Sequence, residues 1–214
     1  MGLGLSVDNM IDEYADVLNL DPDDGDIQTA AVRHFNAAQR WMFNKYEWPE
    51  LIESDQTFTT DGSASYDLTA VGYFGSSFGR VRDKSIRIGN NNVYSNTKSY
   101  FDEVDPDGSS TGTSLYYCQV SRTDFRLWPV SSGDTVKLDY LAYPTVLTST
   151  TTEASISFEA TRHELICDGG IWRGMRKYGF TEWRDERKEW FKQVKDIFGN
   201  SRVHFYPKKI IPSW

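Results

Sequence analysis

The sequence predicts an α+β protein with a helical bundle formed by N- and C-terminal helices, an inserted antiparallel β-rich subdomain and an extended C-terminal tail. Apolar residues recur at helical spacing near both ends of the chain and alternate with polar residues in the middle. Clusters of Gly, Asn, Asp and Pro mark the changes between these patterns. The expected domains are the bundle of residues 1–55 and 155–199, the β-rich insert of residues 56–154, and the arm of residues 200–214.

The composition is that of a folded globular protein. Of the 214 residues, 39% are hydrophobic and 14% aromatic, which is enough to build a core, and 25% are charged. The apolar runs are short, so we expect no membrane span, and the first residues lack the positive region of a secretory signal. We expect Cys118 and Cys167 to be free thiols in a protein that folds in a cytoplasm.

Charge is segregated along the chain. The total is −8, but residues 1–55 carry −9 whereas residues 160–214 carry +5. This polarity can pair the two ends within one fold or pair subunits head to tail, and it can equally reflect two solvated helical faces of different sign. A protein that coats duplex DNA would show a stronger basic surplus.

Two helices are expected before Trp48-Pro49, which should stop the second because a residue before proline disfavours helix. Ser6 can cap the first helix and Asp26 the second, with an acidic loop at residues 21–25 between them. The apolar face of the first contains Val7, Met10, Ile11, Tyr14, Val17 and Leu18. The face of the second contains Ile27, Ala30, Ala31, His34, Phe35, Ala38, Trp41 and Met42.

Strand patterns fill residues 56–145. Phe58, a turn at Asp61-Gly62 and Tyr66 predict a hairpin, while residues 98–104 are open to either a short helix or an irregular segment. Three clear strands are expected at residues 115–120, 125–128 and 135–143. In the last strand, alternation predicts that the even positions face a core. These positions are Val136, Leu138, Tyr140 and Ala142.

Two further helices are expected after Phe158. Gly169-Gly170 in the first would let another backbone approach closely, and Gly179 should end it. Thr181 can cap the second helix, and Gly199 should end it. The inward face of the first contains Leu165, Ile166, Gly169, Trp172 and Met175. The inward face of the second contains Trp183, Trp190, Phe191, Val194 and Phe198.

No catalytic or cofactor-binding motif is found, so we expect neither enzymatic activity nor a cofactor. The acidic loops lack the glycine and glutamate of a calcium loop, and no phosphate-binding loop is present. His163 and Cys167 stand at the spacing of two metal ligands, but no third ligand is near, and we expect His163 and Glu164 on the polar side of a helix. A metal-dependent hydrolase using these two residues stays an alternative.

The aromatic residues suggest a second alternative. Tyr116, Tyr117 and Trp128 could form the stacking platform of a carbohydrate-binding module. Trp41, Trp172, Trp183 and Trp190 instead fall at helical spacing with other apolar residues, which favours a core role.

Residues 201–214 form a tail that is unusually apolar for exposed chain. The tail can fold back onto its own core, or it can dock on a neighbour, for example by adding a strand to a sheet edge. The apolar residues that would make such contacts are Val203, Phe205, Tyr206, Ile210, Ile211 and Trp214.

The order of elements and several short patterns resemble the head-to-tail adaptor, or head-completion, proteins of tailed bacteriophages. The patterns are YEW at residues 46–48, FRLWP at 125–129, VKLDYLAYP at 136–144, and a helix opening with RHELI at 162–166. The likeness spans most of residues 6–199. Another neck or tail-completion protein remains an alternative.

The resemblance implies a structural virion protein that forms a homo-oligomeric, twelve-fold ring beneath the portal protein. The ring would extend the channel through which packaged DNA passes without sequence-specific binding, and would provide a platform for tail or nozzle proteins. Family members commonly use a C-terminal extension to grip the portal, which would give this role to the six apolar tail residues. The expected location is the neck at the portal vertex, after assembly in the host cytoplasm and without a membrane.

Overall fold

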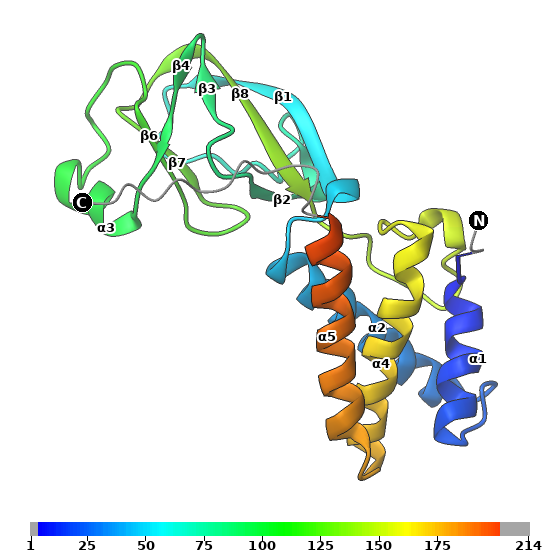
Figure 1. Ribbon diagram of the computed structural model, residues 1–214. Helices are drawn as coiled ribbons and strands as arrows, with labels where there is room; N and C mark the ends of the chain where they lie inside the picture. The colour runs from blue at the N-terminus through cyan, green and yellow to red at the C-terminus, as the bar shows by residue number, and fades with distance from the viewer. Residues whose placement is uncertain (1–3, 202–214) are drawn as a thin grey trace, which may run out of the picture. The chain divides into compact units, whose positions relative to one another are not determined.

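The computed structural model describes residues 4–201, which form two compact units (Figure 1). The helical unit contains the described residues up to Trp48 together with those from Pro144 onward, and the β unit contains Pro49–Tyr143. The α+β class is therefore confirmed, with helices at both ends of the chain and strands between them.

The first helix, α1 (Val7–Leu18), begins as predicted at Ser6, whose side chain accepts a hydrogen bond from the Asn9 amide at 3.2 Å. Its apolar face is buried except at Val17, which is 43% exposed and was wrongly predicted to face inward. Val17 follows Asp16 in the chain, so α1 exposes one apolar side chain next to a carboxylate.

The second helix, α2 (Gly25–Lys45), begins two residues earlier than predicted. Asp24, rather than Asp26, is the capping residue, and its carboxylate accepts the Asp26 amide at 2.8 Å. Asp26 lies in the first turn, where a negative charge is favoured by the helix dipole. The helix ends before Trp48-Pro49 as predicted, and the buried Trp48 donates its indole N–H back to the Met42 carbonyl at 2.9 Å.

The central helix of the helical unit is α4 (His163–Tyr178), which packs against α1, α2 and α5 (Trp183–Ser201) (Figure 1). The predicted close approach at its glycines is confirmed: a β-carbon on Gly169 would lie 2.6 Å from that of Ala38 on α2. Gly179, at φ 83°, ends α4 as predicted. The predicted end of α5 at Gly199 is wrong, because one glycine weakens a helix without terminating it and the helix continues to Ser201.

The β unit contains two sheets. In the five-stranded antiparallel sheet, β8 (Ser132–Ala142) pairs with β1 (Ile52–Asp61), β2 (Phe78–Val81) and β3 (Arg87–Ile88), and β3 pairs with β4 (Asn91–Asn92). In the other sheet, the central strand β6 pairs in parallel with β5 and antiparallel with β7. The bounds of these three strands are Tyr94–Ser95 for β5, Tyr116–Gln119 for β6 and Phe125–Trp128 for β7.

The predicted hairpin after Phe58 is wrong. Phe58 lies opposite Val136 of β8, and Tyr66 bridges to Phe125 instead of returning along β1. The turn at Gly62, with φ 87°, redirects the chain toward β7, and this long-range pairing leaves no local signal. The segment left open by the sequence is a helix, α3 (Lys98–Val104), which is capped by Thr97 and has a Lys98–Asp102 ion pair on its surface.

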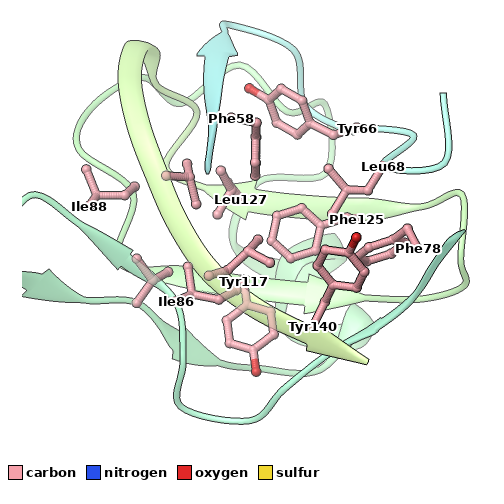
Figure 2. Packing of buried hydrophobic residues seen from close by; sticks show 13 residues of the cluster. Phe58, Tyr66, Leu68, Phe78, Ile86, Ile88, Tyr117, Phe125, Leu127 and Tyr140 are labelled. Carbon is pink, nitrogen blue, oxygen red and sulfur yellow. The ribbon is translucent and has the colours of Figure 1, made fainter. Parts of the chain in front are cut away.

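Side chains from both sheets and their connections converge on one core in the β unit (Figure 2). Val136, Leu138 and Tyr140 of β8 are buried there as predicted, while Ala142 is half-buried. Leu141, on the opposite face of the strand, is fully buried as well. Buried and exposed side chains therefore do not strictly alternate at the end of β8. This part of the strand pairs with β1 on one edge and with β2 on the other.

Candidate functional site

An open groove of about 390 Å³ follows the first half of α5. It is lined by Trp183, Arg184, Arg187, Lys188 and Phe191, and these five residues are called the α5 groove below. Trp183, Arg187 and Phe191 are spaced four residues apart, so they form one stripe along the helix. The groove therefore has an aromatic floor and a cationic rim supplied by a single element.

Arginine guanidinium groups lie over aromatic rings throughout this surface. Arg184 is 5.6 Å from the ring centre of Trp183, and Arg176 of α4 lies 5.5 Å from the same ring. Arg187 is 5.2 Å from the ring of Phe191 and 5.8 Å from that of Trp172. Each contact of this kind stabilises by about 0.5–1 kcal/mol at an exposed site, which orients the side chain without neutralising its charge.

Arg173 is the innermost of these cations. Its guanidinium lies 4.2 Å from the ring centre of Trp172 and 5.1 Å from that of Trp190, and it donates a hydrogen bond to the Gly169 carbonyl. Burial, and then the positive charge of Arg187, lower the pKa of Arg173 to about 10, so the group remains charged at neutral pH.

The four arginines are not neutralised by the helical unit itself. Within residues 4–201, no carboxylate forms an ion pair with Arg173, Arg176, Arg184 or Arg187. The neighbouring lysines differ, because Lys188 pairs with Asp185 at 2.8 Å and Lys192 pairs with Glu189 at 3.4 Å. Positive charge is therefore left over at the arginines.

The opposite charge is concentrated on α1. Asp8, Asp12 and Asp16 are exposed at intervals of four residues, so their carboxylates form a line along the helix. Among the described residues, none of the three takes part in an ion pair. Figure 1 shows α1 and α5 on opposite sides of α4, so the acidic line and the α5 groove belong to helices that α4 separates.

The structure does not assemble the metal site considered from the sequence. His163 is only 1% exposed, so its predicted place on the polar side of the helix is wrong, and its Nε2 lies 3.0 Å from the Phe158 carbonyl. Glu164 is exposed as predicted. Cys167 and Cys118 are both free and buried, and burial raises the pKa of each thiol. No cluster of three ligands that could hold a metal occurs in residues 4–201.

The predicted sugar platform is divided between two faces. Tyr116 and Trp128 lie together, with ring centres 5.9 Å apart, and Tyr100 packs edge-on against Trp128 at 6.0 Å. Tyr117 points the other way, into the core, where it stacks on Phe125 at 5.9 Å. The three residues therefore share no common binding surface.

The six tail residues predicted to contact a neighbour lie outside the described residues. These are Val203, Phe205, Tyr206, Ile210, Ile211 and Trp214. Conversely, the sequence did not single out the arginines at 173, 176, 184 and 187. Their signal was present in the basic surplus of residues 160–214 and in the spacing of arginine against tryptophan.

Comparison with known proteins identifies the family of the chain. Residues 5–204 match the family model of the SU10 adaptor protein, whereas no curated protein matches. The chain therefore belongs to the SU10 adaptor protein family, which confirms its resemblance to phage head-to-tail adaptors. Membership makes it a structural phage protein of the virion that interacts with portal and tail proteins. None of the helices in residues 4–201 has the length and apolar character needed to span a bilayer.

Proposed function

We propose that this adaptor assembles into a ring beneath the portal, extends the DNA channel and provides the docking platform for tail components. The observation that carries the proposal is the separation of charge between α1 and α5 on opposite sides of the helical unit. A molecule with complementary surfaces on two sides can bind the next copy head to tail, and such contacts close into a ring when the rotation between copies permits. The family resemblance gives twelve copies as the expected ring.

The arm of residues 200–214 is proposed to grip the portal through its apolar side chains. These residues are too apolar to remain exposed without cost, and a partner surface would remove that cost. Each arm contributes a modest contact, but a closed ring presents many arms together, so attachment to the portal becomes multivalent.

We propose that the channel wall lets DNA pass without binding it. The chain has a net charge of −8, and a channel wall of this sign repels the phosphate backbone instead of retaining it. Packaged DNA would then pass through without sequence-specific binding, and the protein would act by assembly rather than by catalysis.

Removing residues 202–214 tests the portal-gripping arm while leaving all of the described helices in place. We expect the truncated protein to unfold at the same temperature as the full chain but to lose cosedimentation with assembled portal. A matched control replaces these residues by a Gly/Ser arm of equal length. Undiminished binding of the truncated protein would contradict the role of the arm, and binding to a tail tube without binding to the portal would favour another neck or tail-completion role.

A further inference from the structure

We propose that the α5 groove of one copy binds the acidic face of α1 from a neighbouring copy, an interface that rests on the ring proposed above. The occupant is thus a second copy of this chain, and the contacting groups are guanidinium and carboxylate. Arginine and carboxylate form two parallel hydrogen bonds, which provide geometric specificity together with charge attraction.

The spacing of the charges on the two helices is compatible. Asp12 and Asp16 are separated by about 6 Å along α1, and Arg184 and Arg187 by about 4.5 Å along α5, from the helical rise per residue. Two helices lying side by side can therefore form both pairs at once. The exposed Val17 beside Asp16 supplies an apolar side chain for the aromatic floor of the groove.

The placement of the two faces favours a head-to-tail contact. Because α1 and α5 flank α4 on opposite sides, one copy cannot satisfy its own groove with its own α1 (Figure 1). Each copy then offers one acidic and one basic face, which is the arrangement that propagates around a ring rather than stopping at a symmetric pair.

A protein partner fits the groove better than nucleic acid. Asp185 and Glu189 each pair with a lysine of α5, so the positive charge of the groove rests on Arg184 and Arg187, two separate guanidinium groups that match two carboxylates better than a continuous phosphate backbone. The chain meanwhile supplies a matching anion, because its first 32 residues contain eight acidic side chains and no basic one. Binding of a DNA duplex by the groove is therefore the competing outcome of the test.

Charge reversal separates these possibilities. The variant Arg184→Glu/Arg187→Glu makes the α5 groove acidic like α1, whereas Asp12→Lys/Asp16→Lys places two cations in the acidic line of α1. All four positions are exposed and outside the core, so each variant should remain folded, which circular dichroism and thermal unfolding check. The control Lys45→Glu/Lys84→Glu makes the same change in net charge as the arginine variant, at exposed residues that belong neither to the α5 groove nor to the acidic line of α1.

Ring formation on assembled portal is then measured by electron microscopy and native mass. We expect each variant alone to require a roughly tenfold or higher concentration for ring formation, because like charges meet at every interface. An equal mixture of the two variants should restore rings, with the two chains alternating, and the control should assemble as the wild type does.

The outcomes distinguish this interface from the function on which it rests. Wild-type assembly together with undiminished assembly of both variants would overturn the interface and leave the proposed ring standing. Unchanged rings accompanied by loss of DNA-duplex binding in the arginine variant would overturn it in favour of nucleic acid. If the wild type itself forms no ring on the portal, the proposed function fails, and the interface fails with it.

Discussion

A β-carbon placed on Gly169 would lie 2.6 Å from the β-carbon of Ala38 and 2.9 Å from the ring of Trp190. No side chain fits at this point, where α4 meets α2 on one side and α5 on the other. The glycine is therefore required for packing, although glycine weakens an isolated helix.

The first prediction concerns this contact. Gly169→Ala should lower the free energy of unfolding by about 1–3 kcal/mol, because the gain in helix propensity is smaller than the cost of overpacking a core. Gly25→Ala is the matched control, since a β-carbon there meets no atom within 4 Å. Urea unfolding of both variants measures the difference, and equal stability of the two would contradict the packing role of Gly169.

The second prediction concerns Asp168, a half-buried carboxyl on α4. Burial, and then the nearby Glu13, Glu164 and Glu186, raise the pKa of Asp168 to about 6. The folded protein thus holds this proton more tightly than the unfolded chain does, so the contribution of Asp168 to stability is present below about pH 4 and is lost as pH rises through 6.

Asp168→Asn should accordingly stabilise the protein by on the order of 2 kcal/mol at about pH 8, and the advantage should disappear toward pH 4. Thermal unfolding of the variant and the wild type across this range measures the effect. A constant stability difference at every pH would show that Asp168 does not titrate in the folded state as described.

The third prediction concerns His34 of α2, whose Nδ1 lies 3.0 Å from the hydroxyl of Tyr14. Burial, followed by the charges of Arg33, Lys177 and Arg173, lowers the pKa of His34 to about 4. Here the unfolded chain binds the proton more tightly, so stability is fully present above the ordinary pKa of 6.5 and is lost as pH falls toward 4.

His34→Gln should remove this acid sensitivity, which amounts to about 1–2 kcal/mol once solvent screening of a partly exposed group is allowed for. Relative to the wild type, the variant should gain stability as pH falls from about 7 to 4. Because His34 and Asp168 act in opposite directions, their two contributions offset each other in the wild type over this range, and the single variants should expose the two slopes.

The fourth prediction concerns Asn36, which holds the chain as it re-enters the helical unit. Its amide nitrogen donates to the Leu147 carbonyl at 3.0 Å, and its amide oxygen accepts the Leu147 N–H at 2.9 Å. Asn36→Ala should cost about 2 kcal/mol because it leaves both backbone groups without a partner. Asn44→Ala, at an exposed position on the same helix, is the control.

Hydrogen exchange at the Leu147 amide gives a second readout. Exchange should accelerate in Asn36→Ala and remain unchanged in Asn44→Ala. Equal protection in both variants would mean that the Asn36 side chain does not hold this segment.

Local features were predictable from the sequence where local chemistry determines them. The Ser6 cap, the end of α4 at Gly179 and the buried face of β8 follow from hydrogen-bonding groups and periodicity within a few residues. The hairpin prediction failed because β1 pairs with β8 more than seventy residues away, and no local pattern encodes that pairing.

At the candidate site, too, some features follow from the local sequence and others depend on tertiary packing. The basic surplus of the last segment was visible in the sequence, but the stacking of Arg173 and Arg187 on Trp172 depends on the packing of α4 against α5. His163 was misplaced for a related reason: its burial is fixed by tertiary packing around the start of α4, where the Phe158 carbonyl provides its partner.

Native mass measurement decides whether this chain joins the portal as a ring. The protein is measured alone and after mixing with assembled portal protein, in each case as the intact chain. We expect a defined complex that contains one closed ring of adaptor copies per portal, with twelve copies in the ring. A protein that keeps its own mass in the presence of portal, with no complex at any concentration tested, would show that the chain does not form this ring.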